Sequence, residues 1–478
     1  MITAVCRVLG TETLESRSGK LGHLRYPAQP ATNAYSPESA DISRVVLGDL
    51  RKPDALNIAT LANRPEIDVS VDGHKVVTRH LAILAMTGAG KSWAARRIIE
   101  QLAAKNYPIV IFDPRGDYTG LADVPSLKKR VKRFYAQFPI FEEDAETAAN
   151  IVNTLGYKLT DPMRARFPDV FNAATSFYVS DADELEQKRE WLLGKVAQPD
   201  RIRHIRPDLW LVGLMAEAAE LSIRNGNADD LRQLQDWGWD GVTGYTRTDA
   251  NTLEAIKKRC RRAAAKLFRM EQTSKKISKA ADPLPTDRKQ LVQYGQISVV
   301  SLAGYASDFQ ATIYALIAED IFTARVSDEL KYQVLFVVEE AHNFAPPKAN
   351  TAAEEESIRV TRQIAQEGRK FGVGLILISQ RPSRLDETAL SMCNSYVIMR
   401  MLNPADQAYV RKVVETIGDD EARMLPDLDI GEAIFSGQFI NFPVLAKLKE
   451  PESKGEREEE DAFEQLEKAH QDMLNGQK

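Results

Sequence analysis

Cysteine is scarce in this sequence. Its 478 residues include three cysteines, Cys6, Cys260 and Cys393, which lie far apart and form no C-x-x-C pair. Neither a disulfide framework nor a structural zinc site is therefore supported, because both need paired or closely spaced cysteines. So few cysteines are typical of a protein from a reducing compartment, and we expect a cytoplasmic location.

Long hydrophobic runs are also missing. No apolar segment approaches the roughly 18 residues that would cross a bilayer, and the first residues lack the charged and apolar regions of a signal peptide. We therefore expect no membrane partner. With 44% hydrophobic and 27% charged residues, the composition is that of a soluble globular protein.

An excess of positive charge is the third absence. The chain carries a net charge of −5, and the ten acidic and four basic residues from Glu450 to Lys478 contribute −6, which leaves +1 for residues 1–449. A near-neutral body can still bind a polyanion through local basic patches. The net charge therefore neither indicates nor excludes a nucleic-acid partner.

The N-terminal part of the chain differs in texture from the rest. Residues 1–76 contain short β-prone runs, such as Ser43–Leu47 and Ile67–Val71, separated by polar loops. Short strands with long loops predict a small barrel or sandwich.

The remainder of the chain falls into three kinds of segment. Residues 77–122 and 294–449 hold short apolar runs that alternate with helical segments, which predicts a parallel α/β sheet covered on both faces. Residues 123–293 are rich in charge and predict a helical insertion. Residues 450–478 form an acidic tail that we expect to be partly helical or disordered.

A phosphate-binding loop follows the apolar run Leu81–Ala85, in the sequence AILAMTGAGKSW. The usual pattern, G-x-x-x-x-G-K-[ST], has glycine where this chain has Ala85, but that position ends the strand and tolerates alanine if its φ is negative. Glycines let backbone N–H groups point inward around a phosphate. Lys91 would reach the β- and γ-phosphates, and the Ser92 hydroxyl would bind Mg²⁺. The residues expected to bind ATP are Thr87, Gly88, Ala89, Gly90, Lys91, Ser92 and Trp93.

Two carboxylates follow a second apolar run, Val334–Val338. Glu339 would hold Mg²⁺ through water, in the place where many such ATPases carry Asp. Glu340 would orient and polarise the attacking water. Adjacent acids at a strand end can also form a solvated turn, but the phosphate-binding loop favours the catalytic interpretation.

A third apolar run, Leu375–Ile378, leads to Gln380. An amide beside the strand that carries Glu340 could sense both the γ-phosphate and the attacking water. This order of motifs implies an ATPase with an extra strand between the phosphate-loop strand and the Glu340 strand. The sequence has neither the N-K-x-D motif of a GTPase nor an S-G-G-Q motif ahead of Glu339, as an ABC ATPase would need.

Several motifs in this order resemble the HerA family, hexameric DNA translocases of the FtsK–HerA superfamily. The resemblance runs from about Leu56 to Leu448. It implies an α/β fold: a RecA-like P-loop ATPase core with a helical insertion, preceded by a small N-terminal β-barrel. The matching stretches are Arg79–Ser92, Phe112–Tyr118, Val338–Phe344, Glu367–Leu375, Ser379–Leu385 and Asn403–Asp406.

The resemblance also implies a ring with nucleotide between neighbouring subunits, which gives three arginines a role. Arg79 looks like a HerA arginine that reaches the neighbour's γ-phosphate. Arg369 and Arg381 are further candidates to stabilise charge in the transition state, in cis or in trans. A surface ion pair is the alternative for each. Asp113 could order the metal shell or the catalytic water, and a turn role for Asp113 and Asp117 is equally compatible with the sequence.

Two basic stretches are candidates to contact DNA. Leu253–Met270 has helical periodicity, and four of its cations recur at one-turn spacing: Lys258, Arg262, Lys266 and Arg269. Such a row could follow a phosphate backbone without reading sequence. The second stretch is Lys128–Arg133. For either stretch the alternative is a solvated face or a docking surface for an acidic partner.

We therefore predict a ring-forming, ATP- and Mg²⁺-dependent translocase or helicase of double-stranded DNA, for which the resemblance implies a hexamer. The resemblance also implies a NurA-like nuclease as partner in DNA end processing, or another effector enzyme in antiphage defence. The alternative is an ATP-gated oligomeric scaffold that activates an effector without sustained translocation. A conjugation-type motor at a membrane fits less well, because membrane segments are absent.

Overall fold

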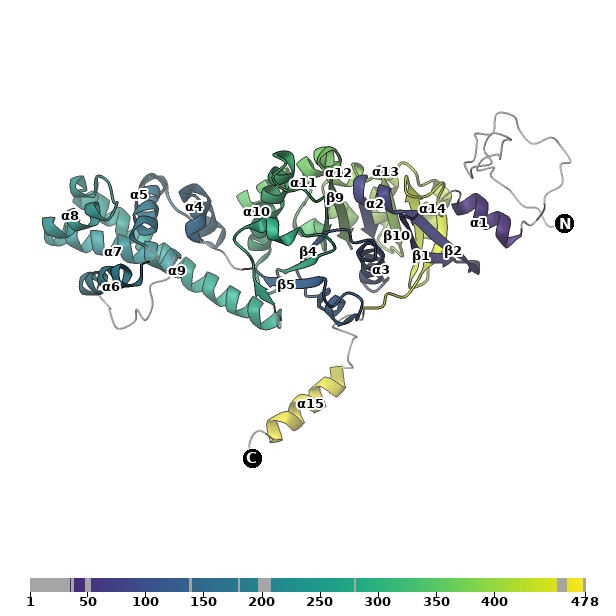
Figure 1. Ribbon diagram of the computed structural model, residues 1–478, viewed down its shortest axis with the longest axis horizontal. Coiled ribbons are helices and arrows are strands. Elements are labelled where there is room, and N and C mark those ends of the chain that lie inside the picture. The colour runs from purple at the N-terminus through teal and green to yellow at the C-terminus, as the bar shows by residue number, and fades with distance from the viewer. Residues whose placement is uncertain are drawn as a thin grey trace.

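A computed structural model describes residues 35, 38–47, 53–136, 140–178, 181–196, 208–278, 281–453 and 462–475. Within this part of the chain, a twelve-stranded sheet forms the core and a helical lobe projects from one end of it (Figure 1). In sheet order the strands are β2 (Arg64–Asp72), β1 (Ala55–Leu61), β12 (Val444–Leu448), β11 (Glu432–Gly437), β10 (Ser395–Met399), β3 (Leu81–Leu84), β9 (Val373–Ser379), β8 (Val334–Val338), β4 (Ile109–Asp113), β7 (Ile297–Ser301), β5 (Val131–Tyr135) and β6 (Asp282–Pro283).

The central strands are parallel, and the strands at one end are antiparallel. From β10 to β6 each strand runs parallel to its neighbours, whereas β11, β12, β1 and β2 pair antiparallel. Strand β9 lies between β3 and β8. This confirms the expectation of an extra strand between the phosphate-loop strand and the Glu340 strand.

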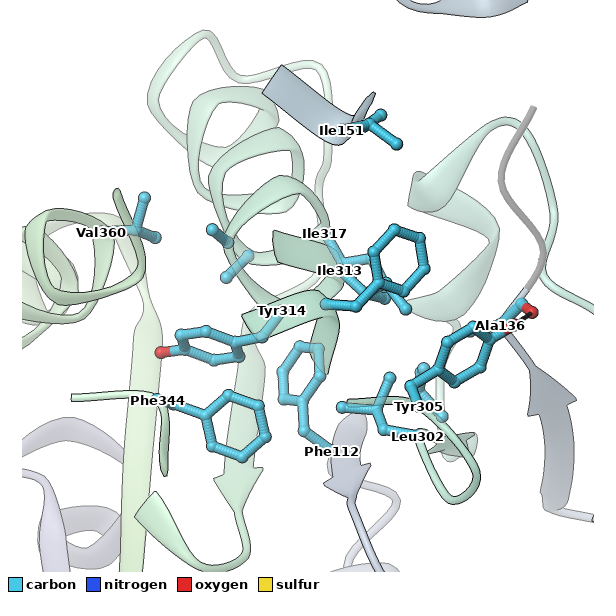
Figure 2. Close-up of a cluster of buried hydrophobic side chains, with 14 of the residues drawn as sticks. Phe112, Ala136, Ile151, Leu302, Tyr305, Ile313, Tyr314, Ile317, Phe344 and Val360 are labelled. Carbon is cyan, nitrogen blue, oxygen red and sulfur yellow. Dashed lines mark hydrogen bonds between the residues drawn. The ribbon is translucent and has the colours of Figure 1, made fainter. Parts of the chain in front are cut away.

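Helices cover both faces of the parallel strands, as the sequence predicted. Along β4, Ile109 and Ile111 face the layer that contains α3, and Phe112 faces the layer of α10 and α11. The Phe112 ring meets the Tyr314 ring of α10 edge-on, with 4.8 Å between ring centroids (Figure 2). The helices of this core are α2 (Gly73–Thr78), α3 (Lys91–Ala103), α10 (Ser307–Val326), α11 (Ala352–Phe371), α12 (Glu387–Ser391), α13 (Pro404–Val413) and α14 (Asp419–Met424).

The N-terminal segment corrects one prediction. Ser43–Leu47 was expected to be β-prone, but it lies in α1 (Ser39–Leu47), which has an acidic side chain in its first turn. Ile67–Val71 lies in β2, as predicted. Strand β1 pairs with both β2 and β12, so this hairpin extends the main sheet and satisfies the edge of β12. A separate small β-barrel is not confirmed in the described residues, and most of residues 1–52 lie outside them.

The helical lobe lies within residues 145–277. Its helices are α4 (Ala145–Thr154), α5 (Asp161–Phe177), α6 (Ala182–Lys195), α7 (Leu209–Asn225), α8 (Ala228–Asp236) and α9 (Arg247–Ile277). Strands β5 and β6 flank the lobe in sequence and join the main sheet, although both fall inside the stretch expected to be the insertion. They extend the sheet because β5 pairs with β7 over its whole length.

Helix α9 connects this lobe to the core (Figure 1). It has 31 residues, and its apolar positions Leu253, Ile256 and Cys260 are fully buried, as the periodicity predicted. A Cβ atom placed on Gly116, in the loop after β4, would lie 4.0 Å from the Cγ2 atom of Ile277. The last turn of α9 therefore lies against the loop that follows β4.

The segment after β12 is attached to α3. The buried carboxylate of Glu100 accepts hydrogen bonds from the Glu452 amide at 3.0 Å, the Ser453 amide at 2.8 Å and the Ser453 hydroxyl at 2.6 Å. Arg96 donates to the Ser453 carbonyl at 3.0 Å. Beyond it, α15 (Ala462–Asn475) is helical. No helix in the described part of the chain is both long and apolar enough to span a bilayer.

The short 3-10 segments complete the described chain. They are η2 (Thr119–Asp123), η3 (Ile140–Glu142), η5 (Val242–Gly244), η6 (Arg288–Leu291), η7 (Ala341–Asn343) and η8 (Pro382–Arg384).

Burial of His80 leads to the first prediction, on acid stability. His80 has φ +56°, is 3% exposed, and burial lowers its pKa from 6.5 to about 4. Between these values the unfolded chain takes up a proton that the folded chain does not, so the contribution of His80 to folding stability falls as pH falls from 6.5 to 4. The full loss is about 3 kcal/mol. Asparagine tolerates a positive φ, so it fits the backbone at position 80, and its side chain does not take up a proton between pH 4 and 6.5.

We therefore expect the melting temperature of His80→Asn to fall less than that of the unsubstituted protein over this pH range. Thermal melts at pH 7, 5.5 and 4.5 measure the difference, and His470→Asn, in exposed α15, is the matched control. If the melting temperatures of the His80→Asn and unsubstituted proteins fell equally over this pH range, this role for His80 would be contradicted.

Candidate active site

The predicted motifs meet at one edge of the sheet. Strands β3, β9, β8 and β4 are parallel neighbours, so their carboxyl ends lie along the same edge. In open α/β sheets this edge is where ligands bind. The phosphate loop follows β3, Gln380 follows β9, and Glu339 and Glu340 follow β8. The loop Phe112–Tyr118 completes the edge after β4.

The phosphate loop has the backbone conformation that its glycines predicted. Gly88 and Gly90 have φ values of +78° and +106°, and Gly90 is the N-cap of α3. Ala85 has a negative φ, and its amide donates to the Ser379 carbonyl at 3.2 Å. Alanine is therefore accommodated here without backbone strain. Trp93, in the first turn of α3, is 43% exposed.

Glu340 lies at the centre of a polar network. Its Oε1 atom accepts a hydrogen bond from Gln380 Nε2 at 2.6 Å and pairs with Arg115 Nη2 at 2.8 Å. Gln380 in turn accepts a hydrogen bond from the Thr87 hydroxyl of the phosphate loop. Glu340 is buried and has φ +51°, a conformation that is costly for a non-glycine residue. Burial raises its pKa.

The second oxygen of Glu340, Oε2, is buried and makes no hydrogen bond within the described residues. The Nδ1 atom of His342 lies 3.5 Å from this oxygen, but burial lowers the pKa of His342 to about 4, so this imidazole is neutral at pH 7 and forms no ion pair with Glu340. The His342 ring instead contacts the Ser379 hydroxyl at 3.2 Å. A buried carboxylate oxygen without a partner is what a water-orienting residue needs.

Glu339 is held by a residue that the sequence did not single out. The buried Tyr118 hydroxyl donates to Glu339 Oε2 at 2.6 Å. Burial raises the pKa of Glu339 to about 8, and the nearby charges of Glu340 and Asp117 add to this, whereas Tyr118 and Lys91 oppose it. Burial, with the adjacent negative charge of Glu339, also raises the pKa of Tyr118, which keeps its proton on the hydroxyl.

Of the two roles considered for Asp113, ordering the metal shell or fixing a turn, its contacts match the second. Its Oδ1 atom accepts from the amides of Arg115, Gly116 and Asp117 at 3.2, 2.7 and 3.1 Å, and its Oδ2 atom from the Tyr118 amide at 3.1 Å. Burial raises its pKa to about 6, against the effect of these amides. Asp113 therefore fixes the loop that presents Arg115 and Tyr118.

The residues near the phosphate loop fit a magnesium ion shared with a nucleotide. Ser92 is half-buried at the start of α3, and the Glu339 carboxylate lies in a buried position under the charge of Lys91. Mg²⁺ in such sites takes one or two protein groups and completes its shell with phosphate and water. The described residues accordingly contain no cluster of three or more His, Cys, Asp or Glu side chains that could bind a metal by themselves.

The structure places the three predicted arginines on two opposite edges of the sheet. Arg79 precedes β3 and Arg369 lies in the last turn of α11, before β9, so both lie at the amino end of the sheet. The seven residues of β9 separate that edge from the phosphate loop by roughly 20 Å. Arg79 and Arg369 thus cannot act on the site of their own chain. Arg381 lies at the carboxyl edge, where its amide donates to the Ser379 hydroxyl. None of the three makes an ion pair with another described residue.

The predicted DNA-contacting row on α9 is only partly available. Lys258 pairs with Glu254 at 2.5 Å, and Lys266 donates to the Leu155 carbonyl at 3.0 Å. Arg262 and Arg269 are both exposed and make no ion pair within the described residues. The stretch Lys128–Arg133 runs from a turn into β5, and Arg130 donates to the Ala103 carbonyl of α3.

Comparison with known proteins gives matches over most of the chain. A family model described as "Helicase HerA, central domain" matches residues 56–321. A protein of Pyrococcus furiosus named DNA double-strand break repair helicase HerA is 27% identical over 474 residues, which cover 94% of this chain and 77% of that one. A Methanocaldococcus jannaschii protein named probable DNA double-strand break repair helicase HerA is 27% identical over 431 residues, covering 83% and 76%.

A solved structure shares the fold. VirB4 of Thermoanaerobacter pseudethanolicus superposes with a TM-score of 0.52 and 14% sequence identity, and the match covers 83% of this chain and 97% of that one. At this identity the similarity concerns the architecture of the sheet and its helices.

Proposed function

The chain belongs to the HerA family, and from that premise we propose that it is a ring-forming ATPase that moves double-stranded DNA. The observation that carries the proposal is the network that joins Thr87 of the phosphate loop through Gln380 to Glu340. In this network a carboxylate suited to catalysis and an amide suited to sensing lie directly beside the phosphate loop.

Each residue of the site has a definable task in hydrolysis. Mg²⁺, when bound, would neutralise charge on the β- and γ-phosphates. Lys91, Ser92 and the amides of the loop would hold the phosphates and the metal, and Glu339 would support the metal shell, with its carboxylate fixed by the hydrogen bond from the Tyr118 hydroxyl. Glu340 takes the proton of the attacking water on Oε2, the buried oxygen that makes no hydrogen bond within the described residues, while Oε1 accepts from Gln380.

The positions of Arg79 and Arg369 support a ring. Both arginines lack an ion-pair partner among the described residues and lie on the edge of the sheet opposite their own phosphate loop. In a ring, that edge can face the nucleotide of a neighbouring subunit, which gives both residues charge to stabilise. We propose a hexamer, as the resemblance implies, with nucleotide at each subunit boundary.

DNA and a second protein complete the proposal. Arg262 and Arg269 of α9, with the exposed lysines of Lys128–Arg133, are the cations we assign to phosphate contacts. Since the described residues hold no cluster of carboxylates able to bind catalytic metals on its own, strand cleavage is assigned to a partner, a NurA-like nuclease or another effector enzyme.

ATP hydrolysis with and without linear duplex DNA tests the proposal and is the second prediction. We expect severalfold stimulation by DNA, which weakens as salt is raised because the contacts are electrostatic. Lys91→Ala, which removes the cation of the phosphate loop, is expected to abolish hydrolysis under both conditions. A rate of ATP hydrolysis that is the same with and without DNA at every salt concentration would instead favour the ATP-gated scaffold.

A further inference from the structure

Arg115 belongs to a chain of polar contacts that begins at the phosphate loop. Thr87 donates to Gln380, Gln380 donates to Glu340 Oε1, and the same oxygen pairs with Arg115. The four residues come from the loops after β3, β9, β8 and β4, so the chain spans the carboxyl edge of four neighbouring strands. In this state the Oε1 atom of Glu340 is fully engaged.

The two partners of the Arg115–Glu340 ion pair differ sharply in exposure. The Arg115 side chain is 53% exposed, whereas that of Glu340 is 2% exposed. The backbone beneath Arg115 is fixed, because Asp113 accepts hydrogen bonds from the Arg115 and Gly116 amides. A guanidinium that is half in solvent, on a rigid loop, can change partners without a large desolvation cost, whereas Glu340 cannot follow it.

A γ-phosphate held by the loop would compete for this guanidinium. It would bring negative charge close to the Glu340 carboxylate, and two negative charges that lie close together in a partly buried site repel each other. The Arg115 guanidinium already lies against Glu340, and its exposed side chain is free to turn. The fork of its donors matches a phosphate oxygen pair as well as it matches a carboxylate.

We propose that Arg115 detects the γ-phosphate of ATP bound to its own chain. Without a γ-phosphate, Arg115 holds Glu340 Oε1 together with Gln380. With ATP bound, Arg115 pairs with the γ-phosphate, and the Glu340 carboxylate, no longer paired with this cation, becomes a stronger base toward a water at its Oε2 atom. This inference rests on the proposed function, since it requires ATP at the phosphate loop.

The role differs from that of a structural ion pair. A structural pair would stabilise the fold or the loop equally with any nucleotide bound. A γ-phosphate contact instead favours ATP over ADP, because only ATP carries the group that Arg115 would bind. The ratio of the two affinities therefore separates the roles.

Binding of ADP and of a non-hydrolysable ATP analogue, in Mg²⁺, forms the test and the third prediction. Isothermal titration of Arg115→Ala is expected to show analogue binding weakened about tenfold, the effect of losing one charged hydrogen bond, with ADP binding changed less than about twofold. Arg115→Lys keeps the charge and is expected to recover part of the loss. Arg232→Ala, which removes an exposed arginine from an ion pair in α8, is the matched control and should change neither affinity.

Two results would overturn the inference. Equal weakening of both nucleotides in Arg115→Ala and Arg115→Lys would assign Arg115 a structural role, and unchanged binding of both would remove it from the site. If the unsubstituted protein bound neither nucleotide, the proposed function itself would fail, and the two failures are thereby distinguished.

Discussion

Glu340→Gln is expected to lower kcat for ATP hydrolysis by at least about a hundredfold while leaving nucleotide binding intact, and this is the fourth prediction. The amide keeps the shape of the side chain and can still accept from Gln380, but it cannot take a proton from water. Binding of a non-hydrolysable ATP analogue should be unchanged or tighter, because the carboxylate no longer repels the γ-phosphate.

Steady-state hydrolysis and equilibrium binding, measured on the same preparation, check both halves of this expectation. Glu190→Gln, at an exposed position of α6 in the helical lobe, is the matched control and should leave both quantities unchanged. An undiminished kcat in Glu340→Gln would show that another group orients the water and that Glu340 is not the catalytic base.

Arg79→Ala is expected to lower kcat by about a thousandfold, the lower range for an arginine that stabilises phosphoryl transfer from another chain, and this is the fifth prediction. The reason is its position at the amino end of β3, far from the phosphate loop of its own chain, where in the proposed ring it would face the nucleotide of a neighbouring subunit. Arg369→Ala, on the same edge, is expected to act in the same direction.

Mixing inactive variants tests whether Arg79 acts between subunits. A Lys91→Ala subunit has an inactive phosphate loop but keeps Arg79. It can therefore supply this arginine to the intact phosphate loop of a neighbouring Arg79→Ala subunit. Co-assembled Arg79→Ala and Lys91→Ala should therefore regain hydrolysis. Co-assembled Glu340→Gln and Lys91→Ala should not, because both changes disable the site of their own chain. No recovery in the first mixture would contradict an action between subunits.

The catalytic edge could be predicted from sequence because its residues lie directly after apolar strands. Parallel strands bring their carboxyl ends together, so Lys91, Glu340 and Gln380 could be grouped without a structure. The same reasoning, applied to residues that precede strands, places Arg79 and Arg369 at the other edge. A role in cis for these two arginines, which the motifs alone left open, is therefore excluded by the direction of the strands.

Arg115 and Tyr118 could not be found in that way. Their roles depend on β4 lying next to β8, and sequence order gives no direct measure of that adjacency. The prediction for Ser43–Leu47 was wrong for a different reason: a short run with two valines fits a strand or a helix, and its helix depends on residues that precede it. The contacts of Lys258 and Lys266 likewise depend on side chains and carbonyls that periodicity does not reveal.

Helix α9 links the loop after β4 to the distant helical lobe through a single continuous helix. Its 31 residues form a rod about 46 Å long, one end of which rests against Gly116 beside Arg115, while the other lies in the helical lobe. A rotation of about 10° at the core end would carry the far end through about 8 Å, because displacement grows with distance from the pivot. A small displacement of the loop after β4 would thereby be enlarged along α9 into a displacement of the helical lobe several times larger.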